Sequence, residues 1–168
     1  MQKTLLLVDD EPGIRKVVGI ALMDCGYTVR EAANGDEGLE VFRRERPPIV
    51  ITDIRMPGMD GLGLLSAIKA ESPGTEVILV TGHGDMDVAI EGLRLDACDF
   101  ISKPVGPEVL EIALKRAEEK ITLRERMREY TENLEALVRE QADKLVVIER
   151  QNIAQQAEEN HHQARQTS

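Results

Sequence analysis

Short aliphatic runs alternate with helical segments five times along the first 120 residues of the chain. Runs such as residues 5–8, 49–52 and 77–80 are unbroken and rich in branched side chains, which is typical of strands buried on both faces of a parallel sheet. The segments between the runs carry apolar residues at helical spacing and are bounded by Gly, Pro and Asn. The pattern predicts an α/β fold with a doubly wound, five-stranded parallel sheet.

The expected strands share a β-branched or aliphatic core, and they lie at about residues 4–8, 29–32, 49–52, 77–80 and 99–102. The expected helices begin near glycine, proline or a polar capping residue, and they lie at about residues 12–25, 36–46, 61–72, 85–95 and from 107 onward.

Acidic side chains follow two of the expected strands where those strands end. Asp9 and Asp10 come directly after the first run, and Asp53 comes directly after the third. Ligands of open α/β sheets lie outside the carboxyl ends of the strands, so these carboxylates are expected to converge. Converging carboxylates repel one another unless a hard cation such as Mg²⁺ lies among them. Thr81 and Lys103 follow two further strands, and the set predicts a phosphoryl-transfer site.

The order of these residues resembles the receiver domain of two-component response regulators. The matching stretches are Val8-Asp9-Asp10-Glu11, Asp53-Ile54-Arg55-Met56-Pro57-Gly58-Met59-Asp60-Gly61, Thr81-Gly82-His83 and Lys103-Pro104. The resemblance covers about residues 1–120 and implies a flavodoxin-like receiver fold. It also implies that Asp53 accepts a phosphoryl group from a cognate sensor histidine kinase.

The resemblance implies a set of Mg²⁺ ligands around Asp53. Asp10 is expected to bind the ion directly, Asp9 mainly through a bound water, and Arg55 through its backbone carbonyl. Lys103 is expected to pair with a carboxylate before phosphoryl transfer and with a phosphoryl oxygen afterwards, from a cis Lys103–Pro104 bond. A purely structural interpretation of Asp9 and Asp10, as caps of the first helix, stays open beside the metal role.

Four residues are expected to respond to the phosphoryl group. By resemblance, Thr81 donates a hydrogen bond to it, and Phe100 swings inward when Thr81 moves. Phe100 has no hydroxyl, so its response depends on packing alone; ordinary core packing is the alternative. Arg55 and His83 flank the water path and are expected to tune hydrolysis of the acyl phosphate.

Two other classes of function compete with a signalling receiver. A phosphohydrolase with an aspartyl phosphate usually carries a second acid two residues after its nucleophile, as a general acid, whereas this chain has Arg55 there. A scaffold that no longer accepts phosphate would not need so complete a site. We therefore expect no enzyme with a separate substrate, only Mg²⁺-dependent self-phosphorylation and self-dephosphorylation at Asp53.

The amino-acid composition indicates what kind of core, binding partners and cellular location to expect. Hydrophobic residues make up 42% of the chain but aromatic residues only 2%, which predicts an aliphatic core. The net charge of −10 argues against direct binding of nucleic acid. No apolar run is long enough for a membrane span and the N-terminus does not resemble a signal peptide. Cys25 and Cys98 are interpreted as small buried hydrophobic residues, so a cytoplasmic location is expected.

A second segment begins at Pro107, after which the chain contains neither Pro nor Gly. Residues 107–160 are expected to form an extended fifth helix that continues as a coiled-coil linker, about 75 Å long over some fifty residues. Residues 161–168 are expected to be a disordered polar tail. The expected dimer seam consists of apolar residues at heptad spacing, namely Leu114, Ile121, Met127, Tyr130, Leu134, Leu137, Leu145 and Ile148.

The heptad pattern predicts a parallel homodimer that transmits the state of Asp53 to a downstream output domain. The phase of the pattern slips between Ile121 and Leu123 and again near Val138, and Gln141 would form a polar layer. A single helix supported by Glu–Lys and Glu–Arg pairs stays open as the alternative.

Overall fold

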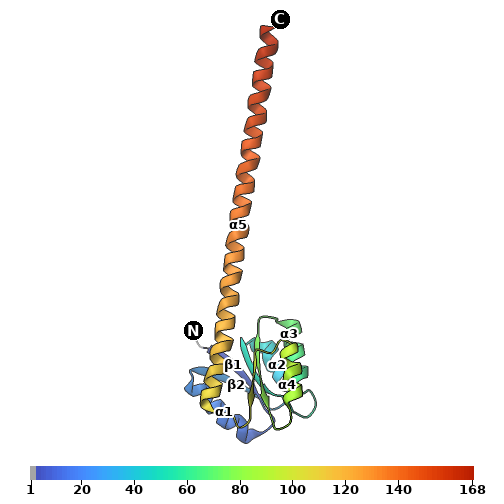
Figure 1. The fold of residues 1–168 in the computed structure, drawn as a ribbon, viewed down its shortest axis with the longest axis vertical. Helices are drawn as coiled ribbons and strands as arrows, with labels where there is room; N and C mark the ends of the chain where they lie inside the picture. The colour runs from blue at the N-terminus through green and yellow to red at the C-terminus, as the bar shows by residue number, and fades with distance from the viewer. Residues whose placement is uncertain (1–2) are drawn as a thin grey trace. The chain divides into compact units, whose positions relative to one another are not determined.

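The computed structural model describes residues 3–168 (Figure 1). Its strands and helices follow one another in strict alternation: β1 (Lys3–Val8), α1 (Pro12–Asp24), β2 (Tyr27–Ala32), α2 (Gly35–Glu45), β3 (Ile49–Asp53), α3 (Gly61–Glu71), β4 (Glu76–Thr81), α4 (Met86–Arg94), β5 (Asp99–Ser102) and α5 (Pro107–Gln166). The chain divides into two compact units, Met1–Arg124 and Glu125–Ser168. The first unit holds the whole sheet, together with α1 to α4 and the first part of α5.

The sheet has five strands in the order β2-β1-β3-β4-β5, and all the pairs are parallel. The predicted doubly wound fold is therefore confirmed. The registers align the carboxyl ends of the central strands, with Val8 opposite Thr52 and Asp53 opposite Val80. The residues that follow these strands consequently emerge at one edge of the sheet.

Two apolar clusters cover the two faces of the sheet. Successive strand residues point to opposite faces, so Leu6 and Val50 pack with α2, α3 and α4, whereas Leu5 and Ile49 pack with α1 and α5. Every residue of β3 and β4 is buried, as expected of central strands in a parallel sheet covered by helices on both faces. Cys25 and Cys98, predicted to be buried, are only partly covered at the edge of the second cluster.

Helix starts near the carboxyl edge are set by local side chains. Asn34 caps α2 by accepting a hydrogen bond from the Glu37 N–H, and Asp60 caps α3 through the Gly63 N–H, both at 2.8 Å. Gly61 opens α3 so close to β3 that a Cβ atom there would collide with the backbone carbonyl of Asp53. Glycine at this position therefore allows α3 to begin against the end of β3.

The first part of α5 belongs to the core of the first unit. Leu110, Ala113, Leu114 and Ala117 are buried in the second cluster, and Ile121 packs against it. Leu114 was predicted in a dimer seam, and that assignment is wrong because the side chain is buried within one chain and only 3% exposed. Ile121, also predicted there, is partly buried against the same cluster.

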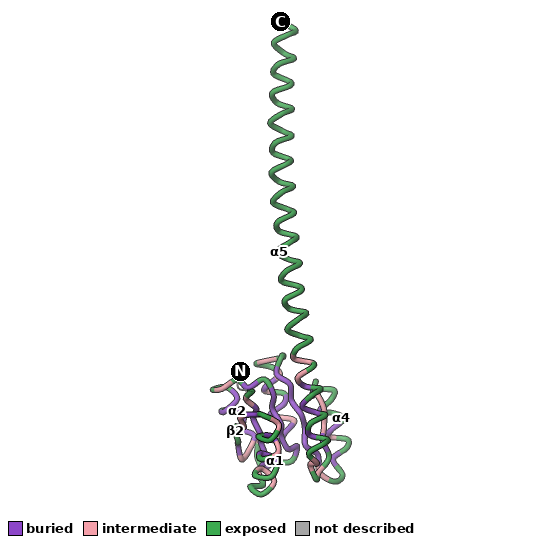
Figure 2. Tube along the Cα trace, turned by 90° about the vertical axis from the view of Figure 1, so that its left-hand side faces the viewer, coloured by how far each residue is buried: buried purple, intermediate pink, exposed green. Residues whose placement is uncertain are grey.

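The second unit is helical along most of its length. The helix continues to Gln166, whereas the sequence predicted a disordered tail from residue 161; no Pro or Gly interrupts the helical hydrogen bonding there. All residues from 122 to 168 are exposed in the single chain (Figure 2). None of the helices among residues 3–168 combines the length and the apolar character that a bilayer crossing requires.

Candidate functional site

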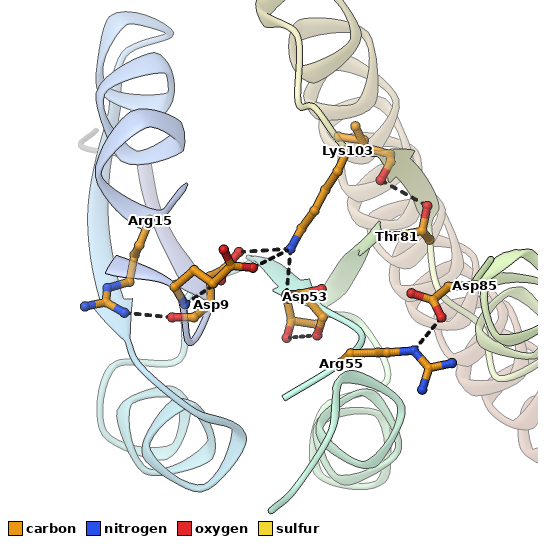
Figure 3. A network of polar contacts seen from close by, with 10 residues as sticks. Asp9, Arg15, Asp53, Arg55, Thr81, Asp85 and Lys103 are labelled. Atoms are coloured by element: carbon orange, nitrogen blue, oxygen red, sulfur yellow. Dashed lines mark hydrogen bonds and ion pairs between the residues drawn. The ribbon is translucent and has the colours of Figure 1, made fainter. Parts of the chain in front are cut away.

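A group of carboxylates lies at the carboxyl edge of the sheet (Figure 3). Asp9, Asp10, Glu11 and Asp53 each place a carboxylate oxygen within 4.8 Å of the others, and we call them the carboxylate cluster. They meet because β1 and β3 are neighbours in register, so the residues after Val8 and Thr52 emerge together. Asp9 and Asp53 are buried, Asp10 is half-buried and Glu11 is exposed.

Lys103 reaches into the carboxylate cluster from the loop after β5. Its Nζ atom lies 2.9 Å from Asp53 Oδ2, 3.4 Å from Glu11 Oε1 and 4.0 Å from Asp9 Oδ2 (Figure 3). The Lys103–Pro104 bond is cis, as the resemblance implied, and the Lys103 N–H donates to the Thr81 carbonyl at 2.8 Å. Lys103 therefore pairs with carboxylates, the placement expected for the resting protein.

The electrostatics of the site reflect crowded negative charge. Burial, followed by the charges of Asp53 and Asp10, raises the pKa of Asp9, although a hydrogen bond from the Glu11 N–H works against this increase. Burial by itself would lower the pKa of Lys103, but its hydrogen bond to Asp53 and the surrounding carboxylates outweigh burial and raise that pKa. Lys103 thus stays charged and offsets part of the repulsion.

The donor set suits a hard divalent cation. Carboxylate oxygens are the protein ligands that Mg²⁺ prefers, and the carboxylate cluster offers several within a space that a single ion can span. The position of the loop after β1 is supported by Arg15, whose guanidinium donates to the Asp9 carbonyl at 2.7 Å. Glu11 is exposed, yet its carboxylate lies close enough to join this set. The role expected for the Arg55 carbonyl stays a prediction.

The residues predicted to respond to a phosphoryl group lie on β4 and β5. The Thr81 side chain is buried, and its hydroxyl donates to the Ile101 carbonyl at 3.4 Å (Figure 3). Phe100 is partly buried and packs against the first apolar cluster. His83 is exposed and lines a groove of about 590 Å³ beside Lys103. In this structure, therefore, the Thr81 hydroxyl is hydrogen-bonded to Ile101 of β5, the neighbouring strand.

Sequence reasoning missed Asp85, which pairs with Arg55. The Arg55 Nε atom lies 2.5 Å from Asp85 Oδ1, and this ion pair joins the loop after β3 to the start of α4 (Figure 3). An acid just before a helix is normally interpreted as a cap, so the sequence held no separate signal for the pair.

Comparisons with known proteins agree with this geometry. A family model described as the response regulator receiver domain matches residues 5–115. The transcriptional regulatory protein GlrR of Escherichia coli (strain K12) is 42% identical over 113 residues, which are 67% of this chain and 26% of GlrR. The C4-dicarboxylate transport transcriptional regulatory protein DctD of Rhizobium meliloti (strain 1021) is 43% identical over 117 residues, which are 70% of this chain and 25% of DctD.

Solved structures show the same similarity in three dimensions. The crystal structure of the receiver domain of NtrX from Brucella abortus has a TM-score of 0.66 and 38% identity, and the match covers 68% of this chain and 98% of that domain. A longer NtrX structure from the same organism has a TM-score of 0.72 at 35% identity, covering 77% of this chain and 29% of that one. The chain thus spans about a quarter of the length of the curated relatives GlrR and DctD.

Proposed function

The chain belongs to the family of response regulator receiver domains, and from this premise we propose that its Asp53 accepts a phosphoryl group from a sensor histidine kinase. One observation carries the proposal: Asp53 is buried within the carboxylate cluster and pairs with Lys103 at 2.9 Å. A carboxylate nucleophile, a cation for phosphoryl oxygens and acids for a metal ion are the parts that phosphoryl transfer needs.

The transfer is a substitution at phosphorus. A carboxylate oxygen of Asp53 forms the new bond to phosphorus, and the bond from phosphorus to the donor's imidazole nitrogen breaks, with its electron pair returning to that nitrogen. Lys103, already beside Asp53, then pairs with a phosphoryl oxygen. Mg²⁺ held by Asp9, Asp10 and Asp53 would supply neutralisation of charge on the transferring group. The Thr81 hydroxyl exchanges its Ile101 acceptor for the phosphoryl group.

We propose no turnover of a separate substrate. A phosphohydrolase needs a general acid beside the leaving group, and the residue two positions after Asp53 is Arg55. Arg55 carries a guanidinium in place of a carboxyl group, and it pairs with Asp85. Hydrolysis of the acyl phosphate by water, tuned by Arg55 and His83, therefore completes the cycle.

The groove beside Lys103 suits the approach of the kinase. It is lined mainly by apolar or small residues of α1 and of the loops after β4 and β5, namely Gly13, Ile14, Val17, Val18, Gly82, His83, Lys103, Pro104 and Val105. Val17 is 66% exposed and Ile20, one turn further along α1, is 48% exposed. An apolar surface next to the acceptor allows a helix that carries the phosphohistidine to dock there.

The proposed output is a dimeric helix. The second unit exposes apolar side chains at heptad spacing, and its part of the predicted seam consists of Met127, Tyr130, Leu134, Leu137, Leu145 and Ile148. Burial of each such side chain contributes roughly 1.5–3 kcal/mol, so two copies of this chain in a parallel coiled coil explain the exposed face. The kinase and a second copy are thus the proposed partners.

The output domain and the compartment are part of the same proposal. GlrR and DctD are named as transcriptional regulatory proteins, and we propose that the helix passes the state of Asp53 to an output domain of that general kind. DNA contact is assigned to such a domain rather than to these 168 residues, whose net charge is −10. The free thiols of Cys25 and Cys98 favour a cytoplasmic location.

Labelling at Asp53 tests the proposal. Intact-mass measurement after incubation with acetyl phosphate and Mg²⁺ should show one phosphoryl group on the wild type and none on Asp53→Asn. Asp24→Asn, which changes an exposed acid at the end of α1, serves as the control and should be labelled like the wild type. Equal labelling of Asp53→Asn and the wild type would show that another residue accepts the phosphoryl group.

A further inference from the structure

Asp85 is a buried acid at the start of α4 that does not cap the helix. It occupies the N-cap position and is only 4% exposed, yet its side chain accepts no hydrogen bond from the first turn of α4. Asn34 and Asp60, at the same position of α2 and α3, do make that bond. The Asp85 carboxylate instead accepts a hydrogen bond from Arg55 at 2.5 Å, so its ordinary capping role is displaced by the ion pair.

Arg55 is otherwise a free surface side chain. Its side chain is 71% exposed, which would normally leave it mobile, and Figure 3 shows it extended towards Asp85. Arg55 follows Asp53 by two residues, in the loop after β3. The ion pair therefore holds the guanidinium of the loop that follows Asp53 at the start of α4, which begins directly after Asp85.

We propose that Asp85 is a positioning residue: it holds the Arg55 guanidinium in the resting protein, and a phosphoryl group on Asp53 competes with it for that guanidinium. The inference rests on the proposed function of Asp53. A phosphoryl group adds negative charge and strong acceptor oxygens, which a guanidinium binds in its planar geometry. Lys103 pairs with one phosphoryl oxygen but is shared among three carboxylates, so Arg55, in the loop after Asp53, is a second cation that can be recruited.

When Arg55 is released, the Asp85 carboxylate becomes free to accept a hydrogen bond from the first turn of α4. The first N–H groups of a helix have no partner within the helix, and a carboxylate at the N-cap satisfies one of them. The start of α4 thus has two arrangements, one with Asp85 bound to Arg55 and one with Asp85 bound to the helix. A ligand shifts an equilibrium between two states only if it binds them with different affinities. In the proposal the phosphoryl group binds the arrangement in which Arg55 is released, so weakening the Asp85–Arg55 pair should strengthen its binding.

Binding of beryllofluoride with Mg²⁺, measured by titration calorimetry, tests this competition. Asp85→Asn removes the charge that holds Arg55 and keeps a side chain that caps helices well, so it should bind beryllofluoride roughly threefold to tenfold more tightly than the wild type. Arg55→Gln should bind more weakly by a similar factor. Asp87→Asn, which changes an exposed acid in the same first turn, should bind like the wild type.

The double variant separates positioning from general effects of charge or packing. If Asp85 acts through Arg55, Asp85→Asn should change nothing in the Arg55→Gln background, whereas a purely structural role would produce the same change in both backgrounds. An unchanged affinity in Asp85→Asn, or an equal gain in both backgrounds, overturns the inference while leaving Asp53 as the acceptor. Absence of binding by the wild type overturns the proposed function and this inference with it.

Discussion

The carboxylate of Glu76, at the start of β4, is fully buried and pairs with Arg124 on α5 at 2.8 Å, across 48 residues of sequence. Lys120 lies 3.4 Å from the other carboxylate oxygen, and Arg124 also donates to the Gly74 carbonyl at 2.8 Å. A buried charge is tolerated only when partners surround it. This cluster therefore fastens the last turn of α5 that belongs to the first unit.

Glu76→Gln should lower the free energy of unfolding of the first unit by roughly 3 kcal/mol, because Lys120 and Arg124 lose the charge that they neutralise. Urea denaturation of a chain ending at Arg124 measures this value. Glu119→Gln is the matched control, since its pair with Lys115 is exposed on both sides and should contribute less than about 1 kcal/mol. Similar losses in the two variants would contradict a special role for the buried pair.

Asp9→Asn should stabilise the protein when Mg²⁺ is absent, by roughly 1 kcal/mol, because it removes a charge that burial and the neighbouring carboxylates disfavour. The amide oxygen can still accept from the Glu11 N–H. Thermal unfolding with EDTA and with Mg²⁺ is the measurement. The wild type should gain stability from Mg²⁺, and the variant should gain less. An equal gain would exclude Asp9 from the metal site.

The same variant tests a pH dependence. The pKa of Asp9 in the folded protein is raised above its ordinary value of 3.8, so the folded state retains a proton that the unfolded state has released. Stability in EDTA should therefore fall as the pH rises from 3.8 through the folded pKa. Subtraction of the Asp9→Asn curve from the wild-type curve isolates this effect, and parallel curves would refute it.

Beryllofluoride should change amide hydrogen exchange in residues 83–105, because Thr81 leaves the Ile101 carbonyl and Phe100 repacks. Thr81→Ala should lose most of the change while still binding the ligand through Asp53 and Lys103. Strand β2, at the far edge of the sheet, provides an internal control and should not respond. Unchanged exchange in residues 83–105 of the wild type would refute the proposed response.

The full chain should sediment as a dimer at about 50 µM, and a chain ending at Arg124 should be largely monomeric. Leu134→Glu places a charge in the apolar seam and should dissociate the dimer, whereas Arg139→Glu, outside the seam, should not. Analytical ultracentrifugation distinguishes the states. A truncated chain that dimerises as well as the full chain would assign the interface to the first unit.

Local patterns in the sequence determined the sheet and its acidic edge. Aliphatic runs that end in Asp9, Asp10 and Asp53 define strands by composition alone, and parallel strands must bring their ends together. Lys103 followed the same rule, and its pairing with Asp53 was predictable for that reason.

Only the tertiary structure decided which residues pack against or pair with Leu114, Ile121, Glu76 and Asp85. Helical spacing shows that Leu114 and Ile121 lie on an apolar face, but the same spacing suits a sheet or a second helix; here the sheet buries Leu114 and Ile121 is partly buried against the same cluster. Nothing in the sequence signalled that Glu76 or Asp85 would pair with a distant cation. Their partners, Arg124 and Arg55, lie 48 and 30 residues away, and a contact between side chains so distant in sequence exists only once the chain has folded around the sheet.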